Sequence, residues 1–283
     1  DWKRYYELVT ALDMWAGKLL RELAEDGLDD NTIVIFWSDH GVGLPRAKRW
    51  LYDSGTRIPF IVRVPAKFRS DDQVMPGSIC DRLISSIDFG PTVMNLAGVT
   101  VPKVMQGRSF LGPELAPPRE DVSGARDRMA ERYEMIRMVR DHRYKYIRNY
   151  EPWKPVYQFI DYSEEGPTMQ ELRRLHEAGQ LPPKMDRCFT TPKPLEELYD
   201  TEADPHEMHN LAADPRYADV LARLRAAHVD WTEQTRDLGV IPEPILVELE
   251  KPVGHRFGIL QQPGVAEVAR RARKTLAAAA EPA

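Results

Sequence analysis

The chain has 283 residues, of which 42% are hydrophobic and 29% charged, with a formal net charge of -5. This is the composition of an ordinary globular protein and not of a disordered chain. No apolar stretch in the sequence reaches the ~18 residues that a membrane-spanning helix needs. The net negative charge gives no electrostatic reason to expect a nucleic-acid partner. Cys80 and Cys188 stand far apart and outside any metal-ligand spacing, so we expect two free thiols.

The first hundred residues predict an α/β layer. Apolar residues from Tyr5 to Leu23 recur at intervals of three and four, which predicts an amphipathic helix ending near Gly27. The apolar, β-branched run 32–37 predicts a strand buried on both faces of a parallel sheet, where ligands gather at the carboxyl ends of the strands. Residues 58–64 predict another strand of the same sheet.

The later segments predict a second, smaller unit. Their expected structures, in chain order, are a short helix framed by Asp88 and Gly98, a surface connection over 101–130, an antiparallel hairpin over 133–150, a charged helix over 164–178, a strand and turn within 195–211, a helix over 215–236, an extended stretch over 241–263 and a terminal helix over 266–280. We therefore expect a sheet domain over 1–125, a small α+β subdomain over 126–240 and a tail over 241–283.

One segment contains most of the candidate functional residues. Ser38-Asp39-His40-Gly41 follows directly on the buried run, and Lys48 stands nine residues past the aspartate. The sequence then continues Leu-Tyr-Asp-Ser-Gly-Thr-Arg-Ile-Pro over 51–59. Asp39 and His40 would thus sit at the carboxyl end of the predicted strand.

This segment closely resembles the second half of the formylglycine-dependent sulfatases, within the alkaline phosphatase superfamily. Further landmarks of that family stand in the same order at 86–92, 143–146 and 197–211, so the resemblance covers about residues 1–235. It implies a partial alkaline-phosphatase-like sheet flanked by helices, plus a small C-terminal subdomain with an antiparallel sheet and a helix. The segment 133–199 is also similar to heparan N-sulfatase-like and related bacterial sulfatases, which implies a sulfated sugar as substrate.

The resemblance implies roles for three residues. Asp39 would be a metal ligand, His40 would occupy the place of a second ligand that is often asparagine, and Lys48 would be the catalytic, substrate-binding residue that holds the sulfate oxygens. One divalent metal is expected, calcium by the resemblance; His40 leaves manganese open, because an imidazole nitrogen suits that ion better than calcium. A fixed cation and a lysine charge fit sulfate ester cleavage, since both stabilise the charge that builds up in the transition state.

The family's nucleophile is a Cys or Ser that is converted to formylglycine, within a Cys/Ser-x-Pro/Ala-x-Arg motif. Neither Cys80 nor Cys188 matches this motif. We therefore expect the chain to be the C-terminal part of a sulfatase, inactive alone, with formylglycine in a preceding part. A periplasmic or extracellular location is also expected.

Alternative readings remain open at this point. Because of His40, the parent could be a phosphonate monoester or phosphodiester hydrolase of the same superfamily. A second alternative is a noncatalytic scaffold that lacks the nucleophile. Lys48 stands between Arg46 and Arg49, and three close cations usually mean a solvated surface. The basic alternation at Arg137, Arg140, Arg143, Lys145 and Arg148 is most simply the solvated face of a hairpin, with the lining of an acidic-sugar cleft as a second reading.

Overall fold

The computed structural model describes residues 2–69, 75–262 and 264–278. Its strands are β1 (Val34–Trp37), β2 (Phe60–Arg63), β3 (Val122–Met129), β4 (Arg132–Arg140), β5 (Tyr144–Asn149) and β6 (Glu196–Asp200). Its α-helices are α1 (Trp2–Glu25), α2 (Asp53–Thr56), α3 (Phe89–Leu96), α4 (Asp161–Glu164), α5 (Pro167–Glu177), α6 (Pro183–Asp186), α7 (Ala218–Gln234), α8 (Glu243–Glu250), α9 (Arg256–Ile259) and α10 (Val265–Ala278). No helix in the described part is long and apolar enough to cross a membrane.

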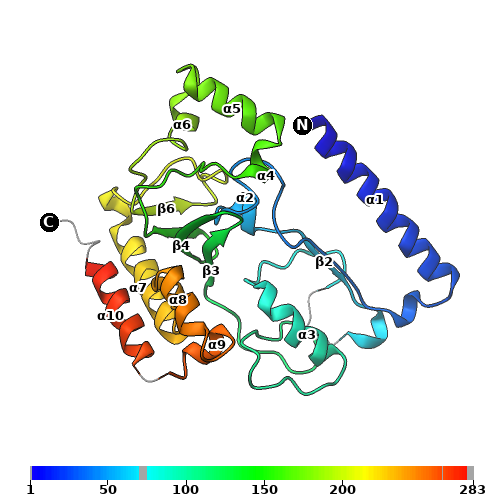
Figure 1. Cartoon of the computed structure of the whole chain (residues 1–283). Helices are drawn as coiled ribbons and strands as arrows, with labels where there is room; N and C mark the ends of the chain where they lie inside the picture. Colours follow the sequence, from blue (N-terminus) through cyan, green and yellow to red (C-terminus); the bar gives the residue numbers. More distant parts are fainter. Residues whose placement is uncertain (1, 70–74, 263, 279–283) are drawn as a thin grey trace.

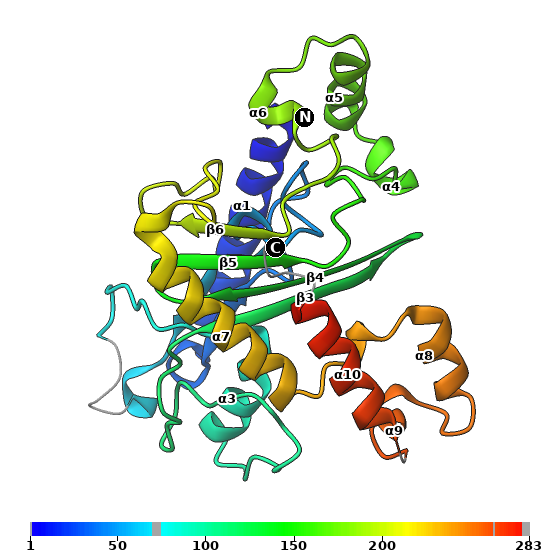
Figure 2. The ribbon, with the colours of Figure 1, turned by 90° about the vertical axis from the view of Figure 1, so that its left-hand side faces the viewer.

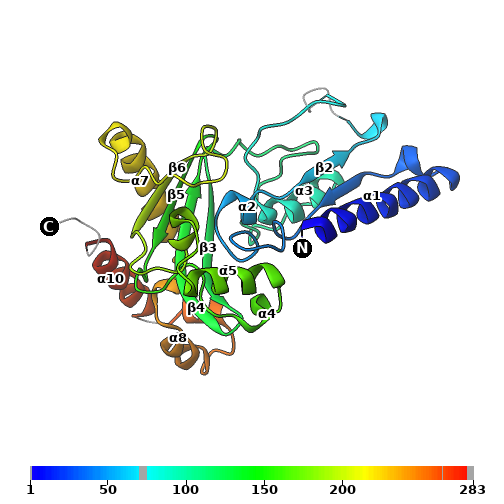
Figure 3. The same ribbon diagram turned by 90° about the horizontal axis from the view of Figure 1, so that it is seen from above.

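The strands form two separate sheets. β1 pairs with β2, and β3, β4, β5 and β6 follow one another in a four-stranded sheet. Viewed from above, α1, α3 and the small sheet lie to one side of the four-stranded sheet, and α7, α8 and α10 lie to the other (Figure 3). The α/β class and the antiparallel sheet of the second unit are confirmed.

The expectation for β1 is only partly correct. Val34 pairs with Arg63 and Trp37 with Phe60, so β1 and the second predicted strand do share a sheet, but they run antiparallel. The connection between them is an irregular loop with a single helical turn, not the crossover helix that would make neighbouring strands parallel. No residue of β1 is fully buried, and Trp37 is 50% exposed.

Helix α1 confirms the predicted helix and shows where its apolar side lies. No residue of α1 is buried, and Trp2, Tyr6, Leu12, Trp15 and Leu19 are all exposed. Figure 1 shows α1 as a long separate rod beside β2. The amphipathic pattern is therefore correct, but the described residues leave its apolar face open.

The four-stranded sheet confirms the predicted hairpin, with β4 and β5 joined across residues 141–143. On one face, Val139, Tyr146 and Leu198 pack against Leu221 and Leu224 of α7. Figure 2 shows α7 crossing this sheet. The opposite face has a different cover, because Trp50, Leu51 and Tyr52 from the loop after β1 pack against Ile136, Met138, Ile147 and Tyr199.

Strand β3 was missed by the sequence reading, which made 101–130 a surface connection. The segment Val-Ser-Gly-Ala-Arg-Asp-Arg-Met has one β-branched residue, and it contains glycine and aspartate, which strands disfavour. Its pairing along β4, from Val122 opposite Arg140 to Met129 opposite Arg132, makes it a strand. The division between 125 and 126 stays a prediction, and it falls inside β3.

The prediction of a solvated face for the basic residues of β4 and β5 is wrong at Arg137, Lys145 and Arg148 and correct at Arg143, which is exposed. Arg137, Lys145 and Arg148 are buried. Arg137 donates from Nε to Asp237 at 2.6 Å and from Nη1 to Asp127 at 2.9 Å. Arg148 forms an ion pair with Glu196 at 3.6 Å. Helix α7 and the loop after β1 cover the two faces, so these cations are buried with carboxylate partners.

The tail is also more ordered than predicted. The expected extended stretch 241–263 contains α8 and α9, because Pro242 and Pro244 lie at the start of α8, where a missing amide hydrogen costs nothing. Helix α10 confirms the terminal helix up to residue 278; residues 279 and 280 lie outside the described residues. Val265 and Ala269 of α10 are buried with Leu246 and Ile259, so this helix packs against α8 and α9.

His228 of α7 makes the stability of the fold depend on pH. It is 4% exposed, and its pKa is lowered to about 4, because burial disfavours the charged ring and Arg137 and Arg148 repel it. The Tyr150 hydroxyl lies 3.1 Å from Nε2. In the unfolded chain the pKa returns to about 6.5, so between pH 6.5 and 4 the unfolded state binds a proton that the folded state does not.

Above pH 6.5, His228 is neutral in both states and should not change the free energy of unfolding. Between pH 6.5 and 4, we expect this free energy to fall by about 3 kcal/mol. Urea unfolding across this range measures the loss. In His228→Gln, which keeps an acceptor for Tyr150, the loss should shrink by that amount, whereas exposed His142→Gln should behave like the parent chain. A similar pH slope in His228→Gln would contradict the assignment.

Candidate functional site

The loop after β1 brings the three predicted site residues into one folded segment. The Gly41 amide donates to the Gly55 carbonyl at 2.9 Å, and the Lys48 amide donates to the Val42 carbonyl at 2.9 Å. These two backbone bonds fold residues 41–55 back on the end of β1. Lys48 therefore lies on a locally closed loop that begins directly after Asp39 and His40.

Two glycines of the family phrase are required by this closure. A Cβ on Gly41 would lie 1.9 Å from the Ser54 carbonyl oxygen. A Cβ on Gly55 would lie 2.3 Å from the carbonyl oxygens of both Ala47 and Trp50. Any side chain at either position would force the two arms of the loop apart.

Asp39 and His40 lie at the open end of this loop. The Asp39 side chain is 84% exposed, and its Oδ1 is 3.4 Å from Nε2 of His40. Nδ1 of His40 is 2.7 Å from the Gly41 carbonyl oxygen, which can only accept a hydrogen bond. The neutral ring therefore carries its proton on Nδ1 and keeps the Nε2 lone pair free for a metal.

These two side chains fit part of a metal site. A carboxylate oxygen and a free imidazole nitrogen are adjacent and accessible, and the carbonyl behind His40 fixes the ring as it does in many metal centres. Across 2–69, 75–262 and 264–278, however, no three His, Cys, Asp or Glu residues come together in a way that could hold an ion. Further ligands would have to come from outside this set.

Lys48 is half-buried, and its ammonium points toward an aromatic ring from a distant segment. Its Nζ lies 5.5 Å from the ring centroid of Tyr162 in α4, and the Arg49 guanidinium carbon lies 4.9 Å from the same centroid. Sequence reasoning missed Tyr162, because nothing in the sequence links α4 to the loop after β1.

A buried ion network anchors the loop to the four-stranded sheet. Lys145 of β5 is fully buried and donates to Asp53 at 2.5 Å, with Glu207 at 3.3 Å. Its ammonium also donates to the Leu51 carbonyl at 3.0 Å. Although burial alone would raise it, Lys145 and Arg140 hold the pKa of Asp53 below its usual value. Burial raises the pKa of Glu207 despite Lys145.

Arg46 adds a second anchor to this network. Its guanidinium donates to the carbonyls of His206 at 2.7 Å and Glu207 at 2.5 Å, and it stacks 3.7 Å from the Tyr52 ring centroid. Arg46 is thus held in place on the turn after β6. The reading of 46–49 as a plain solvated cation run is wrong at Arg46.

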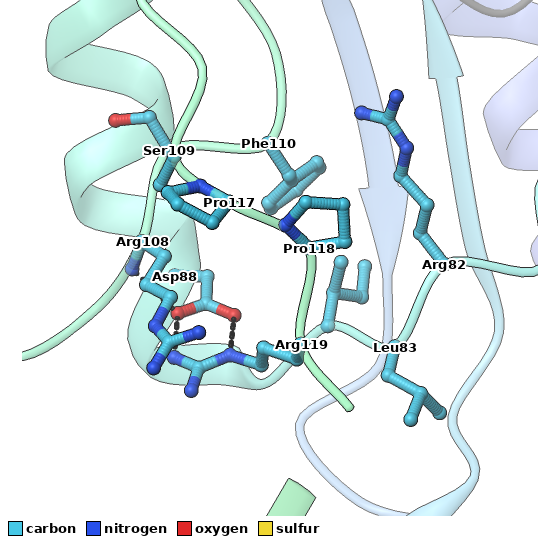
Figure 4. Close-up of a pocket in the computed structure, with 11 residues that line it drawn as sticks. Arg82, Leu83, Asp88, Arg108, Ser109, Phe110, Pro117, Pro118 and Arg119 are labelled. Atoms are coloured by element: carbon cyan, nitrogen blue, oxygen red, sulfur yellow. Dashed lines mark hydrogen bonds and ion pairs between the residues drawn. The ribbon is translucent and has the colours of Figure 1, made fainter. Parts of the chain in front are cut away.

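A separate hollow lies beside α3, shown in Figure 4. At its base, Asp88 accepts hydrogen bonds from Arg119 at 2.5 and 3.0 Å and from the amides of Ser85 and Arg108. Asp88 is buried, and its bonds with Arg108 and Arg119 tie the segment around residues 108–119 to the start of α3, while the Ser85 amide caps the turn before that helix. The hollow therefore belongs to the scaffold, which explains the Ser-Ile-Asp landmark at 86–88 in physical terms.

Known proteins resemble this chain across both sheets. The sulfatase family model matches residues 2–99. An ulvan-active sulfatase of Formosa agariphila is 41% identical over 87% of this chain and 40% of its own length. The human N-sulphoglucosamine sulphohydrolase is 29% identical over 89% of this chain and 52% of its own. Among solved structures, a 2-O GAG sulfatase superposes with a TM-score of 0.52 at 26% identity, over 77% of this chain and 40% of the other.

The chain is a relative of the sulfatases, and the resemblance predicted from its sequence is confirmed. The sulfatase superposition also confirms the predicted fold class. The chain spans about half or less of the length of these relatives. Sulfatases of this family generally use a metal and a formylglycine.

Gly55→Ala should open the loop. Because the new Cβ would collide with two carbonyl oxygens, we expect a loss of about 1–3 kcal/mol in the free energy of unfolding and faster hydrogen exchange at the Lys48 amide. Urea unfolding and amide exchange measured by mass spectrometry give both quantities. Gly43→Ala is the matched control in the same loop, since nothing lies within 4 Å of its Cβ position. Equal effects at both glycines would disprove the packing argument.

Lys145→Met should destabilise the chain by about 3–5 kcal/mol, because it leaves Asp53 and Glu207 buried without their shared cation. The urea unfolding midpoint measures the change. Lys18→Met removes an exposed helix pair with Glu22 and should change the free energy of unfolding by less than about 0.5 kcal/mol. A similar small change for Lys145→Met would mean that the network does not anchor the loop.

Proposed function

We propose that this chain supplies the sulfate-binding lysine and part of the metal site of a sulfatase that hydrolyses sulfate esters of a sugar. The observation that carries the proposal is the closed loop of residues 41–55, in which two backbone hydrogen bonds and two obligatory glycines hold Lys48 close to the backbone that directly follows Asp39 and His40. The relation to sulfatases supports the same assignment.

The surroundings of Asp39, His40 and Lys48 are consistent with the role proposed for each. Asp39 would hold the metal through its exposed carboxylate, and His40 through Nε2, which the Gly41 carbonyl leaves unprotonated. Lys48 would place its ammonium against the sulfate oxygens and stabilise the negative charge of the transition state. The bound metal would polarise the sulfate oxygens, and a formylglycine from another part of the enzyme would provide the nucleophile.

The proposal includes the identity of the metal ion, calcium or manganese. Calcium is the ion that the family resemblance implies, and an exposed carboxylate suits it. The imidazole nitrogen suits manganese better. The metal content of the purified protein after dialysis, measured in the parent and in His40→Asn, separates the two ions. If the imidazole selects manganese, the parent should retain manganese and His40→Asn should lose that preference.

The substrate class and location follow from the relatives. The relatives described above are named for action on ulvan, N-sulphoglucosamine and GAG, which supports a sulfated sugar as the substrate here. We also propose a periplasmic or extracellular location, because a sulfated polysaccharide is too large to enter the cytoplasm intact.

The proposal predicts a loss of activity in Lys48→Ala. In the full-length protein, expressed with a formylglycine-generating enzyme, kcat/KM for 4-nitrophenyl sulfate should fall about 100- to 1,000-fold, as when a charge-stabilising donor is removed from other sites. Exposed Lys103→Ala should match the parent. Unchanged turnover in Lys48→Ala would remove the lysine from the site.

Two further measurements distinguish the alternatives. Mass spectrometry should find the ~18 Da loss that marks conversion of a cysteine to formylglycine. An unmodified nucleophile position and no turnover would favour a noncatalytic scaffold. Faster turnover of 4-nitrophenyl phenylphosphonate than of the sulfate would favour a phosphonate monoester hydrolase.

A further inference from the structure

We infer that Arg49 and Tyr162, next to Lys48, form a subsite for a second anionic group on the substrate. The inference rests on the proposed function and deepens it, because it concerns how the same site chooses its sugar. The subsite joins the loop after β1 to α4, which lies in the long connection between β5 and β6 (Figure 1).

The geometry begins with the ring. Tyr162 is 62% exposed, and the side chains of Lys48 and Arg49 both lie within cation–π distance of it, at 5.5 and 4.9 Å from the centroid. An exposed aromatic ring next to two cations offers an apolar surface and positive charge in one place. A sulfated sugar ring has the same two properties, an apolar face and negative substituents.

Among the residues that the structure describes, no carboxylate lies within ion-pair distance of Lys48 or Arg49. Within the described residues neither Lys48 nor Arg49 forms an ion pair, whereas Arg46 is bound to backbone carbonyls. The carboxylate whose charge Arg49 reaches is that of Glu131. Its pKa is lowered, first by its own amide and that of Asp161, and further by Arg132 and Arg49. Glu131 therefore offsets part of the charge of Arg49, but it accepts its hydrogen bonds from backbone amides and forms no ion pair with Arg49, so the guanidinium can still donate to an anion.

The backbone on both sides of Lys48 is strained. Arg46 has φ +60° and Arg49 has φ +82°, two residues other than glycine in the left-handed region on either side of Lys48. Each such residue is strained and persists only where its surroundings hold it, which is typical of ligand-binding segments. Here the contacts of Arg46 to His206, Glu207 and Tyr52 supply that support.

The two side chains differ in the anion that each can bind. Lysine is a compact point charge, suited to a sulfate whose geometry changes during reaction. Arginine presents a planar fork that matches the oxygens of a second sulfate or a carboxylate in two parallel hydrogen bonds. Arg49 would thus bind the anionic group that does not react, with the sugar ring against Tyr162.

The test compares two sugars that differ by one sulfate, glucosamine 2-N,6-O-disulfate and glucosamine 6-O-sulfate, by titration calorimetry on the full-length protein. The parent should bind the disulfate about tenfold or more tightly than the monosulfate, the usual effect of one charge-assisted hydrogen-bonded contact. In Arg49→Asn the ratio should fall to about one; asparagine tolerates positive φ, so this variant should also fold. Tyr162→Ala should weaken the binding of both sugars.

Arg82→Met is the matched control, because Arg82 is an exposed arginine beside the α3 hollow. Its ratio should equal that of the parent. Equal affinity of the parent for the two sugars, no binding of either sugar, or an unchanged ratio in Arg49→Asn would each overturn the subsite. Because calorimetry needs no turnover, these outcomes are independent of Lys48→Ala, which tests the proposed function by activity.

Discussion

The candidate site depends on the buried ion network of Asp53, Lys145 and Glu207. These residues come from the loop after β1, from β5 and from the turn after β6, and their charges meet where water is excluded. A charge in such a place is stable only with its partner, so the three segments can only be buried together. The end of the loop at Asp53 therefore takes its position from the four-stranded sheet.

This anchoring explains how a short loop can keep a strained backbone. Trp50, Leu51 and Tyr52 fix its far arm in the core, and Gly41 and Gly55 allow the near arm to approach within backbone hydrogen-bond distance. Between the two arms, residues 46–49 have little freedom. The side chains that face solvent there, Lys48 and Arg49, are consequently presented by a rigid support, which is the condition for binding an anion at a defined place.

The sequence predicted the local features well and the long-range ones poorly. The helices at 2–25 and 218–234 and the hairpin of β4 and β5 follow from periodicity and turn residues. The roles of Asp39, His40 and Lys48 come from a compact motif and stay predictions. Strand β3 could not be predicted, because its residues favour no strand and its pairing with β4 decides its structure. The burial of Arg137 and Lys145 was also missed. Their carboxylate partners lie up to a hundred residues away, and alternation of charged residues alone cannot distinguish solvent from a buried partner.

The sequence also failed to predict two other long-range features: the contact of Tyr162 with Lys48 and the antiparallel pairing of β1. Tyr162 meets Lys48 only because the connection between β5 and β6 folds back over the loop.

The open side of α1 has a practical consequence for work with the chain by itself. Leu8, Leu12, Trp15 and Leu19 share one face of the helix and form an apolar stripe that nothing in the described residues covers. A stripe of this kind adheres to other apolar surfaces, including the same stripe on another molecule. Light scattering of the isolated chain would therefore depend on concentration, and a mild detergent would act on α1 before it reached the core beneath the four-stranded sheet.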